Sequence, residues 1–192
     1  RDFLKTAGAT ALAISPIGFL SGCGSRTKAP GSEPQKAGEM TYRINEAKND
    51  KVSILGYGCM RWPMKKNEEG KDIIDQEKVN ELIDYALEKG VNYFDAAPVY
   101  LQGQCEAATG EALSRHPRES YFVATKLSNF NDASRAEGIR MYKASLEAFR
   151  TDYLDYYLLH SIKNAATFTK RFVDNGLIDF LMEERKAGRI RN

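Results

Sequence analysis

Short apolar runs alternate with longer stretches of helical periodicity through most of this chain. The runs span 91–97, 121–127 and 153–160, and each is rich in Tyr, Phe, Val or Leu. Runs of this length and composition are typical of buried strands. Because strands that alternate with helices favour a parallel sheet covered by helices, the pattern predicts an α/β domain.

Polar side chains follow these runs at the points where the predicted strands end. They are Asp95, Tyr100, Lys126 and His160, with Tyr100 in the loop after the first run. The carboxyl ends of parallel strands meet at one edge of a sheet, where an α/β barrel presents its chemistry. A carboxylate, a phenol, an ammonium and an imidazole can together hold and move a proton. The four residues therefore predict a proton-transfer site and make the chain an enzyme candidate.

The remaining elements follow from turn signals and apolar spacing. Extended runs at 40–47 and 51–60 are split by the turn signal Asn49-Asp50 and predict a hairpin leading into the first strand. Helical spacing predicts four helices. They cover about 75–90, 106–115, 132–150 and 165–186, the last interrupted at Gly176, and 189–191 resembles the start of another strand.

The positions of the polar residues favour a (β/α)₈ TIM barrel over a doubly wound sheet, because they follow several strands instead of one switch point. Gly56-Tyr57-Gly58 does not open a helix, so the phosphate loop of a dinucleotide-binding Rossmann unit is missing. A barrel needs eight strands, and 40–192 holds four and the start of a fifth. We therefore expect the N-terminal half of a barrel, truncated at its fifth strand; the alternative is a half-barrel that dimerises.

The first 23 residues have the features of an export signal. A basic start (1–5) precedes an apolar, small-residue run (6–20), and Leu20-Ser21-Gly22-Cys23 resembles a lipobox. The start also resembles the second half of a twin-arginine motif. We expect an exported protein on the envelope or periplasmic side, lipid-anchored at Cys23, with no other membrane contact. The alternative to an export signal is a buried apolar helix with an incidental Cys. Residues 24–39, which follow, have the composition of a flexible tether.

Charge and metal-ligand counts exclude other classes. The net charge is +2 and the basic residues are scattered, which gives no reason to expect a nucleic-acid partner. Three cysteines and two histidines without ligand spacing predict no metal site in these residues.

The ordered motifs resemble the aldo-keto reductase superfamily. The segments that carry the resemblance are 90–100, 106–113, 124–126, 152–160 and 188–191. The hairpin 40–54 is similar to the plug that closes the bottom of that family's barrel. The resemblance implies NAD(P)H-dependent reduction of an aldehyde or ketone by hydride transfer, with a small carbonyl compound as substrate.

The resemblance also implies a role for each polar residue. Tyr100 is expected to be the general acid, with the Lys126 ammonium stabilising its phenolate form and Asp95 holding that ammonium in place. His160 is expected to orient the carbonyl oxygen. Alternatives remain open: Asp95 and Lys126 are also consistent with a structural ion pair, Tyr100 with a packed aromatic and His160 with a core histidine.

The resemblance implies further contacts as well. Candidate cofactor-binding residues are Cys59, Met60 and Asp95, although Cys59 also suits a small core position. Candidate substrate-pocket residues are Trp62, Tyr100 and His160. The expected cofactor is NADPH or NADH, and an iron–sulfur cluster is a further expectation for a domain downstream of the barrel. The alternative function is a lipid-anchored, non-catalytic binding subunit that retains the barrel.

Overall fold

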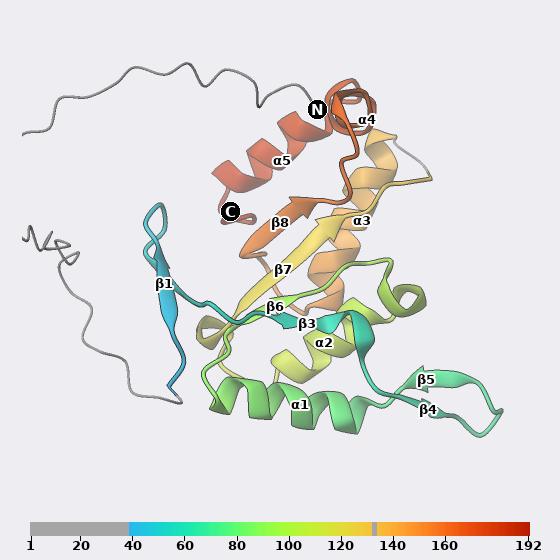
Figure 1. Ribbon diagram of the computed structural model, residues 1–192. Helices are drawn as coiled ribbons and strands as arrows, with labels where there is room; N and C mark the ends of the chain where they lie inside the picture. Colours follow the sequence, from blue (N-terminus) through green and yellow to red (C-terminus); the bar gives the residue numbers. More distant parts are fainter. Residues whose placement is uncertain (1–38, 132–133) are drawn as a thin grey trace, which may run out of the picture. The chain divides into compact units, whose positions relative to one another are not determined.

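The computed structural model describes residues 39–131 and 134–192, and a four-stranded parallel sheet lies at its centre (Figure 1). Its strands are β3 (Tyr57–Gly58), β6 (Tyr93–Asp95), β7 (Phe122–Leu127) and β8 (Tyr156–Leu159), in the order β3-β6-β7-β8. Neighbours in the sheet follow one another along the chain, as in a barrel. The predicted parallel sheet is thus confirmed, and within the described residues it is open.

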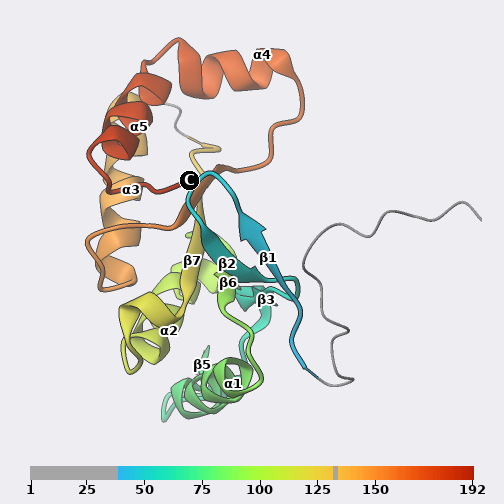
Figure 2. The same ribbon diagram turned by 90° about the vertical axis from the view of Figure 1, so that its left-hand side faces the viewer.

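The long helices lie together on one face of this sheet (Figure 2). They are α1 (Gln76–Glu88), α2 (Cys105–Leu113), α3 (Arg135–Ala148) and α5 (Leu177–Lys186); α4 (Ala165–Phe168) is short. Two predicted glycine stops are confirmed. Gly90, with φ of 83°, follows the end of α1, and Gly176, with φ of 68°, precedes α5. Glycine adopts this left-handed conformation without the steric cost that a β-carbon brings.

Alternation along the strands separates the core from the opposite face of the sheet. Tyr157 meets Tyr142 of α3 at a ring-centroid distance of 5.4 Å, so it faces the helices. Its neighbour Tyr156 instead meets Tyr93 at 5.2 Å on the opposite face. Because successive side chains point to opposite faces of a sheet, Asp95 lies on the same face as Tyr93, away from the helices.

The hairpin of β1 (Tyr42–Asn45) and β2 (Asp50–Ser53) contacts the amino ends of the sheet strands. Asn92, which precedes β6, donates to the Lys51 carbonyl at 2.9 Å and accepts from the Ser53 amide at 2.8 Å. Asn45 lies 3.3 Å from the hydroxyl of Tyr156, the first residue of β8. The predicted hairpin is confirmed, and it packs at the end of the sheet opposite the predicted site.

A second hairpin, β4 (Met64–Lys66) paired with β5 (Asp72–Ile74), was not predicted. All three residues of β4 are exposed, so this segment has no apolar alternation to mark it as a strand. Its turn is held by the Asn67 side chain, which accepts the amides of Glu69 and Lys71 at 3.1 and 2.8 Å.

The strand β8 begins three residues later than predicted because a carboxylate replaces its first ladder contacts. Asp155 is 1% exposed, and it accepts the Val123 amide at 2.9 Å and pairs with Arg118 at 2.6 Å. Leu154 bridges in parallel to Ile190. This bridge agrees with the strand start predicted at 189–191.

Within 39–131 and 134–192, every helix is too short or too polar to cross a bilayer. The predicted export signal, Cys23 and most of the predicted tether lie outside the described residues.

Candidate active site

The four predicted residues lie at the carboxyl ends of three adjacent strands. Asp95 is the last residue of β6, Lys126 is the second-to-last residue of β7, and His160 directly follows β8. Tyr100 begins a 3₁₀ turn, Tyr100–Gly103, in the loop after β6. The parallel sheet therefore brings together side chains that are far apart in the sequence. Asp95 and His160, for example, are separated by 65 positions.

The Lys126 ammonium is the centre of the cluster. It lies 2.5 Å from Asp95 Oδ1 and donates to the Ala96 carbonyl at 2.7 Å. It also lies 5.1 Å from the centroid of the Tyr100 ring. The Lys126 side chain is 12% exposed, so two acceptors fix a largely buried charge beside the phenol. This arrangement can stabilise negative charge that develops on the phenol oxygen.

Tyr100 and His160 meet at right angles across the site. Their ring centroids are 5.9 Å apart and their planes make an angle of 89°. Three consecutive residues after Tyr100 have positive φ: Leu101 (49°), Gln102 (56°) and Gly103 (88°). Left-handed conformations are costly for Leu and Gln, and such strain clusters at functional sites. The strained turn directs the chain from Tyr100 into α2.

The His160 imidazole is held from the side of β7. Its Nδ1 lies 2.7 Å from the Ser128 hydroxyl, and its main-chain amide donates to the Leu127 carbonyl at 3.1 Å. Burial lowers the pKa of His160, the positive charges of Lys126 and Arg171 lower it further, and Asp95 opposes them. His160 is therefore held toward its neutral form, in which one ring nitrogen donates and the other accepts.

The predicted cofactor and pocket residues in the loop after β3 lie in different environments. Cys59 is fully buried, and burial raises the pKa of its thiol. Because its side chain occupies a core position, only the main chain of Cys59 is available to a cofactor. That role stays a prediction. Met60 is 48% exposed and is free to contact a ligand. Trp62 is 3% exposed and donates from Nε1 to Thr109 at 2.9 Å. The indole can pack in the core because Thr109 accepts the hydrogen bond of its N–H. This buried position differs from the pocket-lining position that was expected for Trp62.

Exposed apolar side chains surround the strand ends and were not predicted as site residues. Each lies in a loop that follows a strand of the parallel sheet: Met60, Val99, Phe130 and Ile162, which are 44–48% exposed. Phe130 packs against His160 at a ring-centroid distance of 5.0 Å. A large apolar residue within three positions of the end of each predicted strand was the available sequence signal. We call these four exposed side chains the apolar rim, of which Phe130 contacts the polar cluster.

A buried carboxylate lies behind the site, on the helical face of β7. Glu106 of α2 is 4% exposed and accepts hydrogen bonds from Thr125 and, at 2.9 Å, from Ser145. Thr125 immediately precedes Lys126. Burial raises the pKa of Glu106, while the two hydroxyls and the positive charge of Lys126 oppose that shift.

Replacing Glu106 with Gln should change how stability depends on pH. The unfolded carboxyl ionises near its usual pKa, whereas the raised folded pKa makes ionisation in the core less favourable. The unfolded state therefore binds fewer protons than the folded state between the two pKa values, and the free energy of unfolding falls as pH rises through this range. Urea unfolding at several pH values should show that fall in the wild type and a smaller one in E106Q. Glu119→Gln, at an exposed position, controls for loss of charge alone; equal pH slopes in wild type and E106Q would contradict the assignment.

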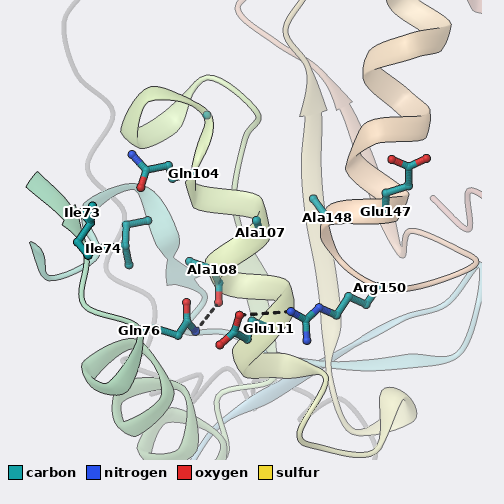
Figure 3. A pocket seen from close by; sticks show the side chains of 11 residues that line it. Ile73, Ile74, Gln76, Gln104, Ala107, Ala108, Glu111, Glu147, Ala148 and Arg150 are labelled. Atoms are coloured by element: carbon teal, nitrogen blue, oxygen red, sulfur yellow. Dashed lines mark hydrogen bonds and ion pairs between the residues drawn. The ribbon is translucent and has the colours of Figure 1, made fainter. Parts of the chain in front are cut away.

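A groove on the described surface is separate from this cluster. It has a volume of about 580 Å³ and lies between the β4–β5 hairpin, α2 and the end of α3 (Figure 3). An ion pair of 3.3 Å between Glu111 and Arg150 crosses one end, and Gln76 donates to the Ala108 carbonyl at 3.0 Å. None of the four predicted residues lines it, so the groove is not the predicted site.

Within residues 39–131 and 134–192, no group of three or more His, Cys, Asp or Glu side chains is placed to hold a metal ion.

Comparison with known proteins identifies the family. The model of the Aldo/keto reductase family matches residues 54–192. The chain is 33% identical over 118 residues to the uncharacterized oxidoreductase YqkF of Bacillus subtilis, covering 57% of this chain and 35% of that protein. It is 34% identical over 109 residues to the methylglyoxal reductase YeaE of Escherichia coli, covering 57% and 36%.

A solved structure agrees with these matches. The aldo-keto reductase AKR11C1 from Bacillus halodurans, in its holo form, superposes with a TM-score of 0.60 at 30% identity, covering 80% of this chain and 49% of that one. The chain thus spans about a third of the length of the curated relatives and about half of that structure. Its sheet order and its four strand-end motifs fit the same α/β barrel-type fold. The chain belongs to the aldo-keto reductase family.

Proposed function

We propose that the protein reduces an aldehyde or ketone to an alcohol with NADPH, and that Tyr100 donates the proton. The observation that carries the proposal is the Lys126 ammonium, fixed 2.5 Å from Asp95 and 5.1 Å from the Tyr100 ring centroid. A buried ion pair alone would need no phenol and imidazole on the same face. In a site that protonates an alkoxide, the phenol can donate the proton and the imidazole can orient the oxygen.

Each residue has one step in this proposal. The Tyr100 hydroxyl donates its proton to the oxygen that becomes negative during reduction, and the Lys126 charge stabilises the phenolate that remains. Asp95, 2.5 Å from the Lys126 ammonium, holds that group in place beside Tyr100. His160, held toward its neutral form by burial and nearby cations, donates a hydrogen bond that orients the substrate oxygen. These interactions are strongest when negative charge has developed, which is the condition for catalysis.

A nicotinamide cofactor, when bound, supplies the hydride for this reaction. The residues present fit such a group, because the cluster keeps an accessible face: the Asp95 side chain is 34% exposed and Met60 is 48% exposed. Asp95, Met60 and the main chain at Cys59 would contact it. Family membership supports NADPH over a metal-based reductant, and the iron–sulfur cluster has no support among the residues described.

We further infer that the parallel sheet forms part of a (β/α)₈ barrel whose bottom is closed by the β1–β2 hairpin. The hairpin contacts with Asn92, which precedes β6, and with Tyr156, the first residue of β8, support this closure, since both residues lie at the amino ends of sheet strands. The export signal, the lipid at Cys23 and the envelope location remain proposals that rest on the sequence of residues 1–23.

The apolar rim favours a small carbonyl compound with an apolar substituent. Phe130, beside His160, and Val99, next to Tyr100, would contact that substituent. The relative named methylglyoxal reductase makes methylglyoxal a suitable first substrate to test.

Steady-state oxidation of NADPH and NADH, with methylglyoxal and with an unbranched aliphatic aldehyde, tests this proposal on the purified protein. We expect the absorbance of the reduced cofactor to fall at a rate that depends on the aldehyde and saturates as the aldehyde concentration rises. Saturable NADPH binding without turnover of any carbonyl would instead favour the non-catalytic binding subunit.

A further inference from the structure

A buried arginine on a π-helical turn lies directly beneath the His160 end of the site. The turn spans Thr169–Val173, between α4 and α5, and carries Arg171, which is 7% exposed. π-helical turns are rare and occur frequently at functional sites, because the additional residue redirects a side chain. A guanidinium is also among the groups that are buried least often without a specific partner.

The Arg171 guanidinium joins the loops that follow β7 and β8. Its Nη1 donates to the carbonyl of His160 at 2.8 Å and to that of Ser161 at 3.2 Å. Its Nη2 donates to Asn129 Oδ1 at 3.0 Å, and Asn129 Nδ2 donates back to the Arg171 carbonyl at 3.1 Å. Asn129 is 2% exposed, so these hydrogen bonds are shielded from water. The pair therefore connects both loops to the π-helical turn.

The loop after β7 also controls the His160 ring itself. Ser128 meets His160 Nδ1 at 2.7 Å, and Phe130 packs against the ring at 5.0 Å. Arg171 supports Phe130 from below, with its guanidinium carbon 4.8 Å from the Phe130 ring centroid. Every residue from Ser128 to Phe130 thus contacts either His160 or Arg171.

The backbone after His160 is strained and is held by the same arginine. Ser161 has φ of 55°, a left-handed conformation that Ser adopts at a cost. The hydrogen bond from Arg171 to the Ser161 carbonyl secures this conformation. Without it, the chain after β8 is free to relax and to turn the His160 ring away from Tyr100.

We propose that Arg171, with Asn129 as its partner, is a positioning residue that fixes the orientation of His160 for carbonyl reduction. This rests on the proposed function, but the contacts of Arg171 with His160 do not depend on it. A lysine would not replace it fully, because one ammonium lacks the planar fork that reaches His160, Ser161 and Asn129 at once.

The charge of Arg171 gives a second, independent consequence. The charged and titratable groups around His160 are Lys126 of β7, Asp95 of β6, Tyr100 of the following turn and Arg171. Burial is the largest cause of the lowered pKa of His160, and the positive charges of Lys126 and Arg171 add to it. Removing only the Arg171 charge should therefore raise the pKa of His160.

Two variants separate these roles. Arg171→Gln removes the charge and keeps one donor, whereas Arg171→Lys keeps the charge and loses the fork. Imidazole titration by NMR reads His160 directly, because the chain has only two histidines and His116→Gln assigns the other signal. We expect the His160 midpoint to move to higher pH in R171Q and to stay near the wild-type value in R171K. We expect kcat to fall about 10- to 100-fold in both, while KM for NADPH stays within about twofold.

The control is Arg140→Gln, which removes a surface arginine that pairs with Glu137 on α3. It should leave both the His160 midpoint and kcat unchanged. A wild-type His160 midpoint in folded R171Q would overturn the proposal, and so would a wild-type kcat in folded R171K. If one variant does not fold, the result for the other variant still tests the proposal. If the parent protein turns over no carbonyl, the proposed function fails, and the R171Q midpoint still decides whether Arg171 acts on His160.

Discussion

The Tyr100→Phe variant should fold normally and lose about 10²- to 10⁴-fold in kcat, because it removes only the hydroxyl that donates the proton. The ring remains, so its perpendicular contact with His160 at 5.9 Å and its position beside Lys126 should be kept. KM for the carbonyl substrate should change far less than kcat, since the loss is specific to the transition state. Steady-state kinetics with NADPH and methylglyoxal measure both constants.

Tyr85→Phe is the matched control for that experiment. Tyr85 is 59% exposed on α1 and has no place in the site. Its loss of a hydroxyl should leave kcat at the wild-type value. Equal kcat for Tyr100→Phe and the wild type would remove Tyr100 from the chemistry.

The Gly110→Ala variant should lose about 3 kcal/mol or more of unfolding free energy, or fail to fold. A β-carbon at Gly110 of α2 would lie 2.1 Å from the Ala148 carbonyl oxygen and 2.6 Å from Phe149 Cα. Both atoms belong to the backbone at the end of α3, so no side-chain rotation relieves the overlap. In a free helix the same change would stabilise by about 1 kcal/mol. The cost of the overlap exceeds this gain, so the net effect of Gly110→Ala on the free energy of unfolding is destabilising.

Gly58→Ala separates this overlap from the general effect of adding a methyl group. A β-carbon there meets no atom within 4 Å, and the φ of −83° suits any residue. Its unfolding free energy should stay within about 0.5 kcal/mol of the wild type. Urea denaturation of both variants gives the comparison. A Gly110→Ala protein as stable as Gly58→Ala would show that α2 and α3 do not approach this closely.

The parallel sheet could be predicted because its strands are short apolar runs between helices of clear periodicity. The break at Gly176 and the end of α1 before Gly90 were also readable, since positive φ favours glycine. The β4–β5 hairpin was not, because β4 is exposed and charged and only the turn at Asn67 marks it.

The candidate site divides in the same way. Residues directly at strand ends, such as Asp95 and Lys126, could be placed together from the topology alone. Trp62 could not, because whether an indole packs in the core or lines a pocket depends on a distant partner, Thr109. Arg171 and Asn129 carry no local signal either. Their burial follows from how two loops and a π-helical turn meet in space.

The most direct test of the account is the fate of deuterium carried on the reduced nicotinamide ring of NADPH. Incubating the purified protein with an aldehyde and NADPH that carries deuterium at both C4 positions, followed by mass spectrometry of the alcohol, follows the hydride itself. We predict alcohol with one deuterium on the carbinol carbon, formed by the wild type at least ~100-fold faster than by Tyr100→Phe. Unlabelled alcohol, or equal rates of labelling by the two proteins, would contradict a reduction in which Tyr100 donates the proton.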